Sequence, residues 1–414
     1  MKELFKQIIK DFHLKKFKGV KKREVNIPLK SEQIIALIGP RRSGKTYLMY
    51  YLITQIEDIT NVIYIDFEDE RLGYNWEFQE IIDAYLELYP TKDLSNVYFF
   101  FDEIQETNNW EKFVRRIHSS LSKNIFITGS SSKMLSKEIS TSLRGRALSY
   151  EILPLSFKEY LSFKDIEIDI ISTQGRANIL NSLNKYIETG GFPGVIVNED
   201  DENIREAMLK SYMNTMMFRD IVERYSISNS NVLRRFINIL YNNLSNEISI
   251  NRIYNDMNSN GLSVSKDSLY NYMDYIEDVF MGFRLNKIDG GYNSKFYSID
   301  LGFNSIMSLK LSKDIGRMIE NLVFLHLKRL GYDIFYDKNG FECDFIIKKN
   351  NVVVNAIQVC YELNENDIDR EIKGIKKVKE RFDLKKGLII NFSQDFSRDD
   401  IDIIPLFKFL LEFK

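Results

Sequence analysis

A short stretch near the amino terminus has the residue types and the spacing of a phosphate-binding loop. An apolar run at 34–38 leads into Gly39-x-x-x-x-Gly44-Lys45-Thr46, and an amphipathic stretch follows. Glycines at these positions let backbone N–H groups surround a phosphate, and the start of a helix adds partial positive charge. Lys45 would reach the β- and γ-phosphates of a nucleotide, and Thr46 would offer its hydroxyl to Mg²⁺. The alternative is a plain glycine turn between a strand and a helix.

The candidate nucleotide-binding set covers the loop and the first helical residues. It comprises Gly39, Pro40, Arg41, Arg42, Ser43, Gly44, Lys45, Thr46 and Tyr47. The two adjacent arginines at the tip of the loop require a separate explanation. They would either face a neighbouring subunit or nucleic acid, or screen phosphate charge and pair with the acidic segment 66–70. The sequence leaves both readings open.

Two carboxylates end another apolar run, residues 97–101, in the manner of a Walker B strand. Asp102 would hold Mg²⁺, and Glu103 would orient or deprotonate an attacking water. The run that follows along the chain ends in Thr128-Gly129-Ser130. Ser130 would then lie near the γ-phosphate as a sensor of its state, or would simply cap the strand.

Arg144 and Arg146 flank Gly145 beyond this point. A guanidinium near a γ-phosphate stabilises the charge that develops in phosphoryl transfer. We therefore treat both arginines as catalytic candidates that come from the same chain or from a neighbour. The alternative is a pair of solvated surface charges.

These candidates can act together only if the fold brings the ends of several strands close to one another. Strand-like runs alternate with helical runs throughout the first 132 residues. The strand-like runs are 34–39, 61–69, 96–104 and 124–132, and the helical runs are 45–56, 78–89 and 110–121. Such alternation predicts an α/β fold, a parallel sheet with helices on both faces. Ligands of these sheets bind at the carboxyl ends of the strands, where every candidate named so far would lie.

Composition sets further limits. The chain has 414 residues, 44% hydrophobic content and a net charge of −2, so we expect two or three domains and only local patches for any nucleic acid. No apolar run is long enough for a membrane helix, and residues 1–23 do not read as a signal peptide. The only cysteines, Cys343 and Cys360, indicate a reducing compartment. We expect a cytoplasmic protein without a membrane partner.

Several motifs together resemble the archaeal-type AAA+ ATPases. They are GPRRSGKT, YIDFEDERL, FFFDEIQ, FITGSSSKMLSKEISTSLRGR and LPLSFKEYL, all within the first 161 residues. YIETGGFPGVIV at 186–197 and YMNTMMFRDIVERYSI at 212–227 resemble the uncharacterised domain fused to those ATPases. The resemblance covers essentially the whole chain and implies binding and hydrolysis of ATP. It leaves the physiological role open.

The segment 228–300 has the order of a winged helix-turn-helix. Three helical runs end with SVSKDSLYNYMDYIEDVFM, and two strands, FRLNKI and KFYSID, follow as a wing. The third helix would read DNA through Lys266, Ser268, Tyr270 and Asn271. It also carries Asp267, Asp274, Glu277 and Asp278, which weakens that interpretation, and such modules also pack against proteins.

The last hundred residues resemble the core of the PD-(D/E)XK nucleases. Helix, three strands, helix and strand follow one another, and a final helix is predicted at 403–413. The resemblance implies a second Mg²⁺ site at Glu320, Asp344 and Gln358. The family's lysine position holds Cys360, which argues against nuclease activity. Lys373 or Lys376 could replace that lysine.

The pattern of alternating residues predicts where the two cysteines point. Cys360 should share a face with Asp344 and line the second pocket, whereas Cys343 should face away, so we expect no disulfide between them.

We expect four parts along the chain. They are an ATPase domain at 1–155, a helical connector at 156–227, the winged helix at 228–305 and the nuclease-like domain at 306–414. The predicted function is ATP hydrolysis coupled to a DNA- or protein-binding second half, with self-association open. The alternatives are a nucleotide-gated switch with little turnover and an ATP-controlled nuclease.

Overall fold

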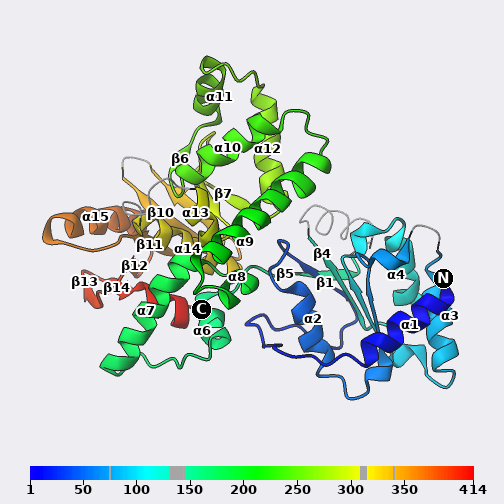
Figure 1. The fold of residues 1–414 in the computed structure, drawn as a ribbon. Helices are drawn as coiled ribbons and strands as arrows, with labels where there is room; N and C mark the ends of the chain where they lie inside the picture. Colours follow the sequence, from blue (N-terminus) through cyan, green and yellow to red (C-terminus); the bar gives the residue numbers. More distant parts are fainter. Residues whose placement is uncertain (74–75, 131–142, 144, 308–314, 339–340) are drawn as a thin grey trace. The chain divides into compact units, whose positions relative to one another are not determined.

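The chain folds into two compact units, Met1–Ile152 and Leu153–Lys414. The computed structural model describes residues 1–73, 76–130, 143, 145–307, 315–338 and 341–414 (Figure 1). Within those ranges, no helix is both long enough and apolar enough to cross a membrane. The finer division into four parts stays a prediction.

A five-stranded parallel sheet forms the centre of the first unit, which confirms the predicted α/β class. Its strands are β1 (Ile34–Ile38), β2 (Val62–Asp66), β3 (Tyr98–Asp102), β4 (Ile125–Gly129) and β5 (Ala147–Glu151). The helices are α1 (Lys2–His13), α2 (Lys45–Ile53), α3 (Gln79–Leu88) and α4 (Trp110–Ser120). The strand order is β2-β3-β4-β1-β5, so β1 and β3 flank β4 in the middle of the sheet.

Alternating side chains bury both faces of this sheet. On one face, Leu48 and Leu52 of α2 join the apolar cluster that contains Leu37 of β1. On the other face, Phe101 of β3 lies 5.6 Å from Phe113 of α4, ring centre to ring centre. Two buried faces explain why the strands read as nearly continuous apolar runs.

Strand β5 was not expected from the sequence. It pairs with β1 at the edge of the sheet, and its second residue, Leu148, is 46% exposed. An edge strand with such an exposed surface lacks the apolar run that marked the other four strands.

The second unit begins with helices. They are α6 (Phe157–Phe163), α7 (Thr173–Thr189), α8 (Pro193–Val197), α9 (Glu202–Thr215), a π-helical segment at Met216–Glu223, α10 (Ser230–Asn242), α11 (Ile250–Ser259) and α12 (Lys266–Asp278). A small antiparallel sheet follows in the order β6-β8-β7. Its strands are β6 (Glu247–Ile248), β7 (Gly282–Asn286) and β8 (Ser294–Ser298).

A six-stranded mixed sheet ends the chain. Its strands are β9 (Asp333–Asp337), β10 (Cys343–Lys349), β11 (Val352–Val359), β12 (Gly387–Asn391), β13 (Phe396–Arg398) and β14 (Ile401–Pro405), in the order β13-β14-β12-β11-β10-β9. The helices of this region are α13 (Leu301–Met307), α14 (Ile315–Arg329), α15 (Glu365–Phe382) and α16 (Leu406–Glu412). Helix α15 packs on one face of the sheet through Ile372 and Ile375, and Phe324 of α14 stands near Phe345 of β10.

The predicted helix at 403–413 is partly wrong. Residues up to Pro405 belong to β14, and the helix begins only at Leu406. Proline fits this boundary because it can open a helix but cannot continue a ladder of backbone hydrogen bonds.

Candidate functional site

The glycine loop after β1 requires both of its glycines. Gly39 and Gly44 have positive φ values of 153° and 96°. A Cβ atom on Gly39 would overlap the carbonyl oxygen of Ile152, whose N–H donates to Ile38 at 2.6 Å. Helix α2 begins at Lys45 directly after Gly44, so its first N–H groups border the loop. The local fold is therefore the one that the spacing predicts.

Lys45 lies inside this loop and is only 4% exposed. Its Nζ atom donates to the carbonyl oxygens of Gly39 and Pro40, at 3.1 Å each. The same atom is 3.6 Å from a carboxylate oxygen of Glu103. A buried ammonium held by weak carbonyl partners is suited to bind phosphate oxygens.

Asp102 and Glu103 end β3 beside the loop, and Thr128 of β4 joins them. The Thr128 hydroxyl donates to Oδ1 of Asp102 and accepts from the backbone N–H of Glu103 at 2.8 Å. The Tyr64 hydroxyl donates to the other oxygen of Asp102 at 2.8 Å. Glu103 adopts a left-handed backbone with φ of 47°, a strained conformation that is typical of functional positions.

The charges around Glu103 set its proton affinity. Burial alone would raise the pKa of Glu103, but the nearby Lys45 ammonium holds that pKa below its usual range. Burial, together with the nearby Asp102, raises the pKa of Asp66 at the end of β2 to about 6. Glu103 is therefore a carboxylate at neutral pH, a state that can accept a proton or orient a water.

Two buried hydroxyls at the site have no hydrogen-bond partner among the described residues. They belong to Ser43 in the loop and to Ser130 after β4. A buried hydroxyl without a partner is costly, and a phosphate oxygen would satisfy it. Thr46 is partly buried and Tyr47 is 58% exposed. The residues present therefore fit a nucleotide phosphate, with Thr46 and Asp102 as the oxygen donors for Mg²⁺.

The two arginines at the tip of the loop behave differently. Arg41 donates to Glu68 at 2.9 Å, which agrees with one of the two readings, the pairing with the acidic segment 66–70. Arg41 also lies 3.8 Å from Glu106, which follows β3. Arg42 is exposed and has a positive φ of 67°.

Arg146 lies at the opposite end of the sheet from the loop. Its carbonyl accepts from the N–H of Ile34, the first residue of β1, whereas Gly39 follows the last. Five strand residues separate the two ends by about 16 Å. Arg146 does not reach the loop of its own chain. Arg144 lies outside the described residues.

Sequence reasoning missed Tyr64, Thr128 and Asp66 as parts of the site. Each sits at or near the carboxyl end of a strand, which is the signal that could have found them. The sequence does not show which of these hydroxyls and carboxylates touch, because that depends on the register between β2, β3 and β4.

A second polar cluster is buried in the second unit and contains all three residues of the predicted second site. The Lys295 ammonium of β8 donates to Glu320 at 3.0 Å and to Asp344 at 2.8 Å. The Gln358 side chain accepts from the backbone N–H of Asp344 at 3.1 Å. Within the described ranges, no group of three or more His, Cys, Asp or Glu side chains is arranged to hold a metal.

Two expectations about this region need correction. Cys360 packs against the apolar cluster that contains Cys343, and it does not share the face of Asp344. A bulge in β10 and the end of β11 at Val359 break the strict alternation on which that prediction rested. Both Lys373 and Lys376 are exposed, and Lys376 pairs with Asp399 at 2.8 Å, so Lys295 is the lysine at this cluster. No disulfide joins Cys343 and Cys360, as expected.

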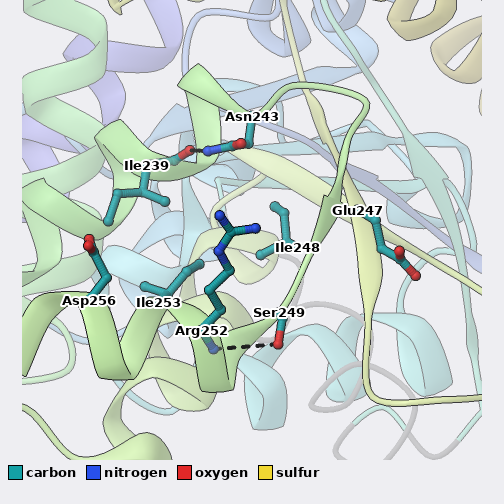
Figure 2. A pocket seen from close by; sticks show the side chains of 8 residues that line it. All are labelled: Ile239, Asn243, Glu247, Ile248, Ser249, Arg252, Ile253 and Asp256. Atoms are coloured by element: carbon teal, nitrogen blue, oxygen red, sulfur yellow. Dashed lines mark hydrogen bonds between the residues drawn. The ribbon is translucent and has the colours of Figure 1, made fainter.

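A separate pocket of about 330 Å³ lies in the second unit between α10, β6 and α11 (Figure 2). Figure 2 shows the Arg252 side chain extending between Ile248 and Ile253. Glu247 and Asp256 also line the pocket, so its charges have both signs. None of the predicted site residues lines it.

The glycine loop lies within a region that matches a known protein family. Residues 31–161 match the family described as AAA domain, and residues 180–313 and 315–409 match two domains of unknown function, DUF8612 and DUF4143. The uncharacterized protein MJ1544 of Methanocaldococcus jannaschii is 42% identical over all of this chain and 96% of its own length. The chain belongs to the same family.

This family extends beyond archaea. An uncharacterized protein of Haemophilus influenzae is 30% identical over 93% of this chain and 96% of its own length. Among solved structures, the Walker-type ATPase PABY2304 of Pyrococcus abyssi is 14% identical, covers 67% of this chain and 91% of its own, and has a TM-score of 0.43. In this chain, the region that matches the AAA domain is followed by the two domains of unknown function.

Proposed function

We propose that the AAA domain binds ATP with Mg²⁺ and hydrolyses it. The observation that carries this proposal is the convergence of Lys45, Asp102 and Glu103 at the carboxyl ends of β1 and β3. The hydroxyls of Ser43 and Ser130, for which the described residues offer no partner, support it, because they supply donors for phosphate oxygens.

Each residue has a distinct role in this proposal. Lys45 binds the β- and γ-phosphates, and the N–H groups of the loop surround them. Thr46 and Asp102 would hold Mg²⁺, which would supply positive charge beside the phosphate oxygens. Glu103 orients the attacking water and accepts its proton, while the Thr128 hydroxyl fixes both Asp102 and the backbone of Glu103.

Steady-state ATP hydrolysis by the full chain tests this function. Wild type should release phosphate in a Mg²⁺-dependent manner, and Glu103→Gln should bind ATP but turn over far more slowly. Glu111→Gln on α4 is the matched control and should behave as wild type. Absence of hydrolysis in wild type, despite tight ATP binding, would favour the second candidate, a nucleotide-gated switch. Its supporting observation is that hydroxyls already engage both oxygens of Asp102.

We also propose that the second half binds DNA or a protein and responds to the nucleotide. Helices α10–α12 with the β7–β8 hairpin have the order of a winged helix, and the acids of α12 are partly neutralised. Arg284 of β7 pairs with Asp274 at 2.7 Å and also with Glu277. The loop between β7 and β8, which would be the wing, is already hydrogen-bonded to another part of the chain. The N–H of Ile288 donates to the carbonyl of Tyr336 at 3.0 Å. DNA would therefore contact α12 rather than the wing.

A comparison of the ATPase rate with and without duplex DNA separates the two kinds of partner. Stimulation that weakens as salt rises supports phosphate contacts with DNA. No effect of DNA at low salt would direct attention to a protein partner or to self-association.

The nuclease-like resemblance of the last hundred residues concerns the fold, and we do not extend it to DNA cleavage. The element order α14-β9-β10-β11-α15-β12 supports the resemblance. The arrangement around Asp344 argues against cleavage.

A further inference from the structure

The cluster around Lys295 joins three elements that are distant in the sequence. Lys295 comes from β8 of the small sheet, Glu320 from α14, and Asp344 from β10 of the large sheet. The side chain of Lys295 is 3% exposed, that of Asp344 6% and that of Glu320 12%. A buried lysine in such a place needs counter-charges, because an isolated ammonium would be strongly destabilised there.

The Nζ atom of Lys295 stands where a divalent cation would bridge the two carboxylates. It lies 2.8 Å from an oxygen of Asp344 and 3.0 Å from one of Glu320, typical distances for charge-assisted hydrogen bonds. A metal ion at the same point would share its position with a positive charge. The two cations would repel each other in a poorly solvated site.

Further hydrogen bonds hold the two carboxylates around the ammonium. The second oxygen of Asp344 accepts from the N–H of Val359 at 3.0 Å. The Tyr297 hydroxyl donates at 2.6 Å to the same oxygen of Glu320 that accepts from Lys295. Gln358 accepts from the backbone N–H of Asp344. Both oxygens of Asp344 and one oxygen of Glu320 are therefore already engaged around an ammonium.

We propose that Lys295 is the resident cation of the Glu320–Asp344 site and takes the place of a divalent metal. The lysine then does two things. It keeps metal-dependent cleavage chemistry out of the last domain, and it links the β7–β8 hairpin to the six-stranded sheet. The proposal uses the nuclease-like fold but is independent of ATP hydrolysis in the first unit.

The proton affinity of the cluster agrees with this role. Burial alone would lower the pKa of Lys295, but the carboxylates of Asp344 and Glu320 raise it above its usual value. Burial and the nearby Asp344 raise the pKa of Glu320, and Lys295 opposes that rise. The two carboxylates therefore favour the charged form of the lysine.

Binding of Mn²⁺ to the full chain without nucleotide, followed by electron paramagnetic resonance, tests the proposal. In the wild type, we expect no Mn²⁺ binding that is lost on substitution of Asp344. Lys295→Met, which removes the charge and retains the apolar stem, should gain one Mn²⁺ site per chain, and Lys295→Met with Asp344→Asn should lose it again. Lys338→Met is the matched control, because that lysine is exposed and 4.0 Å from Glu342.

Two results would overturn the proposal. One is Mn²⁺ binding or Mg²⁺-dependent DNA nicking by wild type that Asp344→Asn abolishes, since Lys295 would then assist a metal rather than replace it. The other is a folded Lys295→Met variant that binds no Mn²⁺.

Loss of folding in Lys295→Met would also be informative. In that case the double variant Lys295→Met with Asp344→Asn should regain folding, because it removes one carboxylate together with the ammonium and leaves the net charge of the cluster unchanged. A double variant that stays unfolded while Lys338→Met folds would contradict the counter-ion role.

Discussion

Thr128 is the residue on which the geometry of the nucleotide site depends most directly. Its one hydroxyl donates to Asp102 and accepts from the N–H of Glu103, so it fixes a metal-binding and a water-orienting group together. It was overlooked in favour of Ser130, which follows two residues later and has a buried hydroxyl without a described partner. We assign Thr128 a positioning role and leave the phosphate-sensing role with Ser130.

Thr128→Val should lower kcat for ATP about 10-fold and change KM little. Valine keeps the shape of threonine but can bind neither the Asp102 carboxylate nor the backbone N–H of Glu103. Loss of one aligned hydrogen bond is worth roughly 1.4 kcal/mol in the transition state. Steady-state kinetics over a range of ATP concentrations would separate kcat from KM. Thr54→Val at the end of α2 is the control. A variant with an unchanged kcat would show that Thr128 is only part of the core.

At the scale of elements, the turn between α7 and α8 depends on the close approach of α13. Gly190 has a φ of 81°, and a Cβ atom there would overlap a carboxylate oxygen of Asp300. The same carboxylate accepts from the N–H groups of Gly191 at 2.6 Å and Gly302 at 2.9 Å. Asp300 therefore ties the glycine turn to the start of α13.

Gly190→Ala should destabilise the second unit by about 3 kcal/mol or more, since it adds steric overlap to an unfavourable backbone conformation. Gly261→Ala is the matched control, because Gly261 has a φ of 79° with open space around it. Only the backbone cost of about 1 kcal/mol should appear there. Urea unfolding of both variants measures the difference in the free energy of unfolding. Equal losses of stability would show that the Asp300 side chain moves to accommodate the added methyl group.

Asp300 should also give the second unit a pH-dependent stability. Burial raises the pKa of Asp300 to about 7, although the N–H groups of Gly191 and Gly302 oppose that rise. A carboxyl group with a higher pKa in the folded state holds its proton better when folded. Its contribution to stability is therefore full below about pH 4, the unfolded value, and is lost as the pH rises to about 7.

The comparison that isolates this contribution is wild type against Asp300→Asn. The difference between their free energies of unfolding should shift by about 1 kcal/mol per pH unit between pH 5 and pH 7, with wild type losing stability as the pH rises. Urea unfolding at four pH values measures this. Parallel pH profiles would mean that Asp300 is ionised throughout.

Much of the first unit could be predicted from the sequence, and the reason is physical. The loop Gly39–Thr46 and the strand ending at Asp102 are local patterns, and a parallel sheet brings strand ends together without further information. Strand β5 was missed because an exposed edge carries no apolar run. Lys295 was missed because its partners lie 25 and 49 residues away on other elements. Cys360 was misplaced because a bulge in β10 breaks the alternation.

At the scale of the whole molecule, the position of Arg146 has a consequence for assembly. It lies at the far end of the sheet from the loop of its own chain, so an arginine at that position can serve a nucleotide only in another copy. We propose that hydrolysis requires at least two chains, with the arginine supplied by a neighbour.

A mixing experiment tests this proposal. Glu103→Gln and Arg146→Ala should each hydrolyse ATP slowly alone, whereas an equimolar mixture should recover part of the wild-type rate. The recovery arises where an intact loop of one chain meets an intact Arg146 of the other. Exposed Arg398→Ala in the second unit, mixed with Glu103→Gln, controls for dilution. Full activity of Arg146→Ala alone would remove Arg146 from catalysis.

The central claim is that Lys45 and Glu103 act on the same ATP molecule in separable steps. The most direct test is to measure ATP affinity and steady-state turnover in Lys45→Ala and Glu103→Gln side by side with wild type. We predict that Lys45→Ala weakens binding about 100-fold, because a buried charge-assisted contact is lost, and that Glu103→Gln binds as wild type and turns over at least about 100-fold more slowly. Wild-type turnover by Glu103→Gln, or unchanged ATP binding by Lys45→Ala, would contradict the account.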